Sequence, residues 1–261
     1  NQLLPAITDW MEKHNHPFAF NTQASIDLAD DTELMEMMAK AGFDCVFIGI
    51  ESPDETTLTQ CHKTQNLNRD IIQAVKKIQS FGLQVQAGFI LGFDTDTQSI
   101  FDRLIKMIQQ SGIIVAMVGL LNAPKGTSLY NKLKKENRLT QTPTGDNTDC
   151  TLNFIPKMDA NQLINGYQRV VKTIYSQKYY YKRIKTFLKD YHIPKNARTK
   201  VTMRDIKTFI RSLWRIGLLE KGKIHYWKTL FWSITKPHAF PLFVRFSIYG
   251  LHFRKLQKSL N

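Results

Sequence analysis

Three apolar runs in the first half of the chain end in residues that could contact a small ligand. Glu51 follows the first run, CVFIGI at residues 45–50. A carboxylate there can accept hydrogen bonds from a ribose diol or from an ammonium group. It could equally accept a neighbouring backbone N–H or pair with a lysine, and the spacing leaves both interpretations open.

The second run carries two glycines, Gly88 and Gly92, which flank Phe89, Ile90 and Leu91. Glycine weakens a strand unless another group must approach the backbone closely. Two glycines near a strand end would let a flat ring lie against the main chain. Tight packing of a helix on the strand would explain the same pair.

The third run, IIVAMVGLL at residues 113–121, ends in Asn122, Ala123 and Pro124. The residues after it, 125–127, turn toward a helix. By itself this segment is best explained as an ordinary connection from a strand to a helix.

An alternation of strands and helices positions these three places. We expect strands at 18–26, 45–50, 84–91 and 113–121, separated by helices that end near Gly42, Gly82 and Gly112. Buried strands separated by helices indicate parallel βαβ units. The fold class is therefore α/β, either doubly wound or part of a barrel wall. Ligands of such folds bind at the carboxyl ends of the strands, where all three places lie.

Capping residues set the expected starts of the helices. Asp30 would cap the first, with Glu33 as its capping-box partner, and Ser52 would cap the next ahead of Pro53. Asn68 would cap a third helix. Thr95 or Thr97 would cap the fourth.

The second half of the chain has a different composition. Residues 1–150 hold 13 Lys or Arg and 18 Asp or Glu, whereas residues 151–261 hold 23 and 4, so the net charges are −5 and +19. We expect an α/β domain at 1–138, a linker at 139–158 and a basic helical domain at 159–261. The basic half would face an anionic partner.

Three cysteines, Cys45, Cys61 and Cys150, are far apart and odd in number. This spacing argues against a disulfide framework and favours a reducing cytosol. It also argues against a metal site held by this chain alone, because clusters and zinc sites need several ligands at short spacing. The sequence shows no signal peptide and no apolar stretch long enough to span a membrane.

Several stretches together resemble the radical S-adenosylmethionine (radical SAM) superfamily, and within it the group with an N-terminal cobalamin-binding domain. Segments 20–31, 41–55, 68–96 and 118–139 carry the likeness, the last with the turn Pro-x-Gly-Thr-x-Leu-Tyr. Residues 145–158 and 166–183 resemble the helical C-terminal domain of uncharacterised function found in part of that group.

The resemblance implies a partial (β/α)₆ barrel of which this chain supplies the last four strands. The family's ribose-contacting position falls on Glu51, and its Gly-x-Ile-x-Gly-x-x-Glu motif, whose backbone meets the adenine, falls on Gly88, Ile90 and Gly92. The other adenine-contacting positions fall near Asn122 and Ala123. The motif's final Glu is Thr95 here, between Asp94 and Asp96, which puts the role of that position in doubt.

The family's cluster-binding Cys-x-x-x-Cys-x-x-Cys motif is not in this sequence. We therefore expect the chain to be the C-terminal part of a longer enzyme, inactive alone. The complete protein would use SAM and a [4Fe–4S] cluster for radical methylation or rearrangement of a small-molecule or lipid substrate, and the use of cobalamin stays open.

Two other functions fit parts of the sequence. The basic helical part could be a non-catalytic module that binds an anionic membrane or a nucleic acid, although no nucleic-acid-binding motif is present. A complete barrel with other chemistry would need about eight strands, and four are visible.

The tail at 221–261 is the segment that we expect to contact a membrane. It has eight Lys or Arg, no Asp or Glu, and many interleaved aromatic residues. Basic residues and Trp or Tyr favour an anionic membrane surface, so the protein would be cytoplasmic and peripheral to the membrane. Alternatively, the aromatic side chains pack onto the barrel and the bases form a solvated face.

Overall fold

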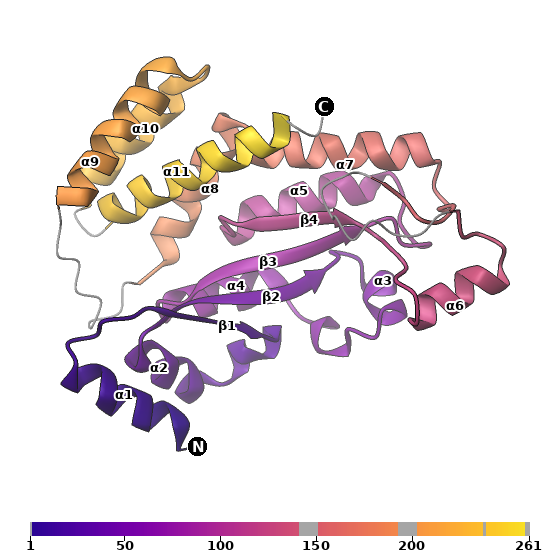
Figure 1. Ribbon diagram of the computed structural model, residues 1–261, viewed down its shortest axis with the longest axis horizontal. Coiled ribbons are helices and arrows are strands. Elements are labelled where there is room, and N and C mark those ends of the chain that lie inside the picture. Colours follow the sequence, from indigo (N-terminus) through magenta and orange to yellow (C-terminus); the bar gives the residue numbers. More distant parts are fainter. Residues whose placement is uncertain (1, 141–150, 193–202, 237–238, 259–261) are drawn as a thin grey trace.

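The computed structural model describes residues 2–140, 151–192, 203–236 and 239–258. Four strands form one sheet, and helices pack against it (Figure 1). Cys150 and the predicted linker residues Pro143 and Gly145 lie outside the described residues.

The sheet has the order β1-β2-β3-β4, and every neighbouring pair is parallel. The predicted alternation of parallel strands is therefore confirmed. The strands are β1 (Phe20–Ala24), β2 (Phe43–Glu51), β3 (Gln84–Leu91) and β4 (Ala116–Leu120).

The helices of the first half are α1 (Leu3–Lys13), α2 (Thr32–Ala41), α3 (Glu55–Gln60), α4 (Ile71–Ser80), α5 (Ser99–Ser111) and α6 (Ser128–Lys135). The second half has α7 (Ala160–Tyr175), α8 (Gln177–Asp190), α9 (Met203–Ser212), α10 (Lys223–Ile234) and α11 (Ala239–Lys258). Short 3₁₀ turns, η1 (Ile26–Asp30) and η2 (Thr64–Asn66), and a π-helical stretch, η3 (Leu213–Leu219), complete the described elements.

The predicted helix caps are wrong by one to three residues. Asp31, not Asp30, caps α2, because Asp30 instead pairs with Arg69. Asp54 caps α3, and Ser52 accepts the backbone N–H of Asp54.

Asp70, rather than Asn68, caps α4. Asn68 adopts a left-handed turn (φ 52°) ahead of that helix, and its N–H donates to Glu55. Neither Thr95 nor Thr97 caps α5, which follows Gln98 without a side-chain cap.

The two faces of the sheet are covered differently. On β2 and β3 the side chains of one face, among them Val46, Ile48, Val85 and Ala87, are fully buried under helices. The intervening positions face the other side, which we call the open face. At the strand starts this open face is covered by α11, whose Arg245 contacts Asp44 and Gln84. A polar cavity of about 360 Å³ remains between α11 and these strands.

The C-terminal helices share the core of the sheet. The largest buried cluster joins residues of the strands, α4 and α5 to residues of α7, α8, α10 and α11. The Tyr175 hydroxyl accepts the N–H of Ala116 at 3.2 Å and donates to its carbonyl at 2.9 Å, which fixes α7 at the start of β4. The fully buried Arg183 of α8 donates to the carbonyl of Ile174 at 2.8 Å.

Candidate functional site

The carboxyl end of β2 carries an ion pair. Glu51 Oε1 lies 2.9 Å from Lys63 Nζ, so of the two interpretations left open, pairing with a lysine is realised in this structure. The pair lies over Gly49, where an added Cβ would come within 2.5 Å of Glu51 Oε1 and 3.0 Å of Lys63 Nζ. A side chain at position 49 would displace these two flexible side-chain ends, so glycine leaves room for the pair against the strand.

The backbone of this strand end is bent. Glu51 has φ 67°, a left-handed conformation uncommon for a residue with a side chain, and the register to β3 shifts between Gly49 and Glu51. Asn66, which is buried, donates to the carbonyls of Gly49 at 3.3 Å and Ile50 at 3.0 Å. The turn η2 thus holds the bent strand end in place.

Gly88 and Ile90 of β3 alternate with buried Phe89 and Leu91, so they lie on the open face. A Cβ added at Gly88 would lie 3.2 Å from the ring of Phe47 on β2. The register pairs Gly88 with Gly49 and Ile90 with Gly119 of β4. An added Cβ at Gly119 would meet nothing within 4 Å, so the backbone there is bordered by open space.

Gly92 has a different environment. Its φ of 105° favours glycine, and an added Cβ would lie 3.0 Å from Leu163 of α7. Its N–H donates to Asp96 Oδ2 at 2.8 Å. The sequence left open that the two glycines allow a helix to pack closely on the strand. This explanation holds for Gly92, whereas Gly88 lies on the open face.

Thr95 stands where the family motif has its final Glu. Thr95 and its neighbours Asp94 and Asp96 all contact other groups of the protein. Asp96 accepts the N–H groups of Gly92 and Phe93, and burial raises the pKa of its carboxyl while these two donors oppose the rise. Thr95 shares a hydrogen bond of 2.7 Å with Thr57, which joins the loop after β3 to α3.

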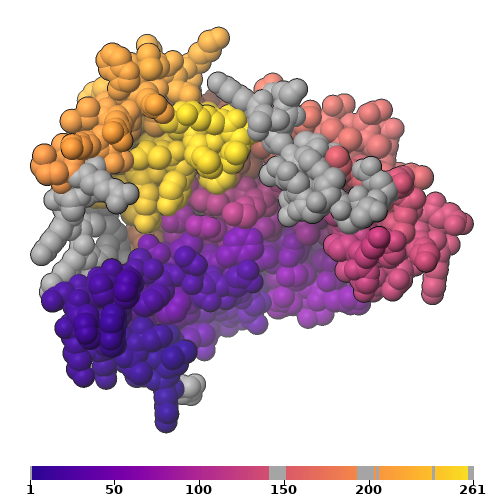
Figure 2. All heavy atoms as spheres, in the orientation of Figure 1, coloured from indigo at the N-terminus to yellow at the C-terminus, as the bar shows by residue number. Residues whose placement is uncertain are grey.

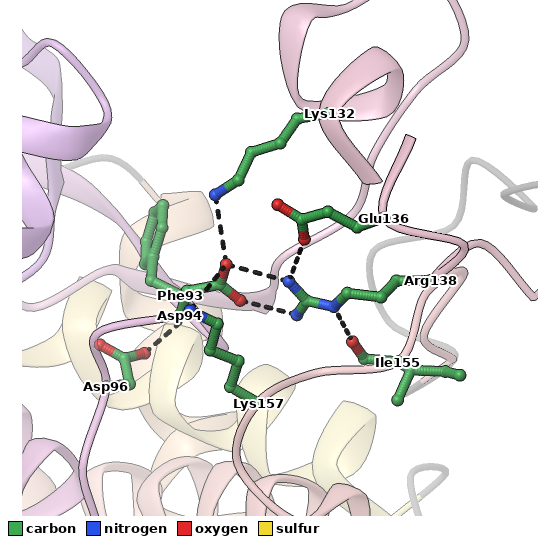
Figure 3. A network of polar contacts seen from close by, with 8 residues as sticks. All are labelled: Phe93, Asp94, Asp96, Lys132, Glu136, Arg138, Ile155 and Lys157. Carbon is green, nitrogen blue, oxygen red and sulfur yellow. Dashed lines mark hydrogen bonds and ion pairs between the residues drawn. The ribbon is translucent and has the colours of Figure 1, made fainter. Parts of the chain in front are cut away.

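Asp94 forms the centre of a charged network at the carboxyl ends of the strands (Figure 3). Arg138 donates to both of its oxygens, at 2.7 and 3.0 Å, and Lys132 lies 3.3 Å away. The hydrogen bond from Arg138 lowers the pKa of Asp94. Arg138 also contacts Glu136 at 2.8 Å and the carbonyl of Ile155 at 2.8 Å. The network joins the loop after β3 to α6 and to the segment before α7.

The carboxyl end of β4 is held by a side chain from the predicted linker. Asn153 Oδ1 accepts the N–H of Ala123 at 2.9 Å, and Asn153 Nδ2 donates to the Ala123 carbonyl at 2.8 Å. Ala123 is fully buried and both of its backbone polar groups are occupied. Asn122 is half-buried, and its side chain is 3.5 Å from the carbonyl of Leu120.

The sequence-predicted residues thus separate into two groups. Glu51, Gly88, Ile90 and Asn122 are partly accessible at or near the carboxyl ends of adjacent strands. The backbone N–H groups of Gly92 and Ala123 are already hydrogen-bonded to Asp96 and Asn153. Sequence reasoning missed Lys63, Asn66, Asn153 and Arg138, whose distances along the chain from their partners form no recognisable motif.

The thiols of the described chain are not placed as ligands. Cys45 and Cys61 are free, and burial raises the pKa of Cys45 to about 11 and also raises that of Cys61. Within the described residues, no three His, Cys, Asp or Glu side chains gather as they would around a metal. Among the helices that are described, none combines the length and apolar character that crossing a membrane requires.

The parallel sheet defines an α/β protein, and in proteins of this class ligands generally bind at the carboxyl ends of the strands. Residues 127–261 match the family described as "Domain of unknown function (DUF4070)", which is more than half of the chain. The chain belongs to this family, the C-terminal region of radical SAM enzymes of the cobalamin-binding group. The resemblance seen in the sequence is thereby confirmed.

Relatives align over most of the chain. It is 36% identical over 256 residues to an uncharacterized methyltransferase of Synechocystis sp., covering 96% of this chain and 48% of the relative. It is 29% identical over 233 residues to the hopanoid C-2 methylase of Rhodopseudomonas palustris, covering 87% and 43%. A bacteriochlorophyllide d C-12(1)-methyltransferase of Chlorobaculum tepidum is 25% identical over 115 residues, 44% of this chain and 25% of the relative.

The chain spans about half the length of the first two of these relatives. All three relatives are named as methyl-transferring enzymes, so the family is one of enzymes.

Proposed function

We propose that this chain is part of a radical SAM methyltransferase and supplies the last four strands of its partial (β/α)₆ barrel. The sequence alone left methylation and rearrangement as alternatives. The names of the relatives favour methylation.

One observation supports this function most strongly. The ends of three adjacent parallel strands bring Glu51 of β2 beside Phe89 of β3, and Ile90 of β3 beside Gly119 of β4, at the edge where such sheets bind ligands. The open space beside Gly119 leaves room for a flat group against the backbone.

The accessible residues fit SAM. We propose that Glu51 accepts hydrogen bonds from the ribose, that the backbone at Gly88 and Ile90 borders the adenine, and that Asn122 contacts its edge. Gly92 and Ala123 would act indirectly, by shaping the loops after β3 and β4, because their N–H groups are already bonded. SAM bound here would supply the radical chemistry of the complete enzyme, and these residues would orient its adenosyl part.

A [4Fe–4S] cluster and cobalamin are proposed for the complete protein only. The described residues of this chain offer no group of ligands that fits a cluster.

The substrate is proposed to be a lipid or another largely apolar small molecule. The open face presents Phe47, Ile90 and the exposed Met117, which suit an apolar molecule better than a charged one. Two relatives named for hopanoid and bacteriochlorophyllide chemistry lead to the same proposal. The division at residues 138 and 159 and the cytoplasmic location stay predictions.

The proposal can be tested by SAM binding to the complete protein in equilibrium dialysis. Glu51→Gln removes the charge, and charge-assisted hydrogen bonds contribute about 1.5–3 kcal/mol, so affinity should fall roughly 10- to 100-fold. Glu36→Gln, on the exposed side of α2, is the matched control and should bind normally. Equal SAM affinity of the two variants would show that Glu51 does not contact SAM.

The substrate class needs a separate measurement. With SAM labelled in its methyl group, label should enter the organic extract of cells that produce the protein. Label confined to the aqueous fraction would contradict an apolar substrate while leaving the SAM assignment intact.

A further inference from the structure

Exposed apolar side chains are concentrated in one segment, α9, η3 and α10. Of the 17 large hydrophobic residues that are exposed in the described chain, nine lie between residues 203 and 234. Single exposed apolar residues are ordinary, but a contiguous group marks an interaction surface. The nine are Met203, Ile206, Ile210, Trp214, Leu218, Leu219, Ile224, Phe231 and Ile234.

The first five of these residues form a row along α9 and η3. They are spaced by three or four residues, which places them on one side of a helix. The opposite side packs inward: Ser212, Ile216 and Gly217 are buried, and Gly217 accepts the indole N–H of Trp227 at 2.9 Å. The segment therefore already has its core contacts, and the row is a second apolar face. Trp214 on this face is 61% exposed.

A basic row runs beside the apolar row. Lys207, Arg211 and Arg215 each follow an apolar row member directly, and all three are exposed. Residues 203–236 hold eight Lys or Arg and two acidic residues. Of the two, Glu220 turns inward to Arg254 at 3.2 Å, so it does not offset the basic row.

We propose that the α9–η3–α10 face docks on an anionic lipid bilayer, with the apolar row at the level of the acyl chains and the basic row among the headgroups. Helices with an apolar face and Lys or Arg beside it lie in the membrane interface without crossing it. Electrostatics disfavours a second copy of the same face as the occupant, because two such basic rows would repel each other.

The docking face differs from the one expected from the sequence. Within 221–261, Tyr226, Phe243 and Phe246 are fully buried, and Phe253 stacks on Tyr175, so these rings pack inward as the alternative interpretation held. Of the nine exposed residues, only Ile224, Phe231 and Ile234, all on α10, belong to that stretch.

The face also lies away from the candidate site. In Figure 1, α9 and α10 lie near the strand starts, whereas the arrowheads point toward α3 and α6. Figure 2 shows the orange α9–α10 surface standing out at that end of the molecule. The face would hold the protein on the membrane rather than admit substrate, so the inference does not depend on the proposed methylation.

The test is co-sedimentation of the complete protein with vesicles of phosphatidylcholine alone or with 30% phosphatidylglycerol. Binding should require the anionic lipid and weaken with added salt. Each basic residue contributes about 1 kcal/mol, or about fivefold, near an anionic surface. The triple variant K207Q/R211Q/R215Q should therefore bind on the order of a hundredfold more weakly.

Two comparisons keep the test specific. K125Q/K134Q/K135Q removes the same charge from exposed residues at the other end of the molecule and should bind within a few-fold of wild type. I210S/W214S should lose binding while keeping the wild-type melting midpoint. Equal binding to neutral vesicles, equal loss in both triple variants, or a concentration-dependent dimer abolished by I210S/W214S would each overturn the proposal.

Discussion

Removing the Asn153 side chain should destabilise the carboxyl end of β4 strongly. Asn153 is 1% exposed, and its amide satisfies both backbone polar groups of Ala123. In Asn153→Ala, a buried N–H and a buried C=O lose their partners. Each costs about 1–3 kcal/mol, so the free energy of unfolding should fall by roughly 2–5 kcal/mol. For a chain of this size the melting midpoint should drop by about 5–15 °C.

The assay is thermal and urea unfolding followed by circular dichroism, with Asn165→Ala as the control. Asn165 is also an asparagine but is exposed on α7, so its truncation should change the free energy of unfolding by less than about 0.5 kcal/mol. If both variants unfold alike, Asn153 does not hold Ala123 as described.

Three further predictions concern the network, the helix packing and the open face. The hydrogen bond from Arg138 lowers the pKa of Asp94 below 3.8, so its stabilisation is complete above about pH 4 and is lost as pH falls through the lowered pKa. The difference in unfolding free energy between wild type and Asp94→Asn should therefore shrink between pH 7 and pH 3 in urea titrations, and a constant difference would contradict this. Gly166→Ala should lower the melting midpoint by several degrees, because the new Cβ would overlap the Phe101 ring where α7 crosses α5, and an unchanged midpoint would refute that packing. Gly119→Leu should leave the melting midpoint close to wild type but weaken SAM binding at least tenfold, since its side chain would enter open space beside β4, and normal SAM affinity would show that the space is not the site.

Gly119→Leu distinguishes a blocked ligand from a damaged fold better than a substitution at Gly92, the position that the sequence alone would suggest first. Gly92→Val should weaken SAM binding if adenine approaches there. In this structure the same change would also force a left-handed backbone on valine and press on Leu163. Loss of binding in that variant would not distinguish a blocked ligand from a damaged fold.

The sheet could be predicted from the sequence because periodicity and composition are local signals. The run at 84–91 matches β3, and the run at 45–50 lies inside β2. The helix caps were missed narrowly because acidic and amide residues stand close together, and contacts distant in sequence decide among them. Asp30 was unavailable as a cap because Arg69, 39 residues away, binds it.

The sequence could predict that the candidate residues lie at or near the carboxyl ends of the strands, but not which contacts support them. The rule that ligands meet the carboxyl ends of parallel strands is enough to select Glu51 and Gly88. No local pattern reveals that Asn153 would hold Ala123 from 30 residues away, or that Arg138 would bind Asp94 across 44. Such partners follow from the tertiary fold, in which the segment before α7 returns to the strand ends.

The end of β2 is the best argument that this edge is shaped for a ligand. A left-handed Glu51 is less stable than an extended residue by about 1–2 kcal/mol, and such strain persists only where surrounding contacts impose it. Here Asn66 fixes the carbonyls of the bent strand, and Gly49 leaves room for the Glu51–Lys63 pair against its surface. A strand with only a packing role in the core would need neither the left-handed Glu51, nor the hydrogen bonds from Asn66, nor the glycine at position 49. Together they hold a carboxylate and an ammonium group at the open edge of the sheet, where a ribose hydroxyl could replace or join the lysine as the partner of Glu51.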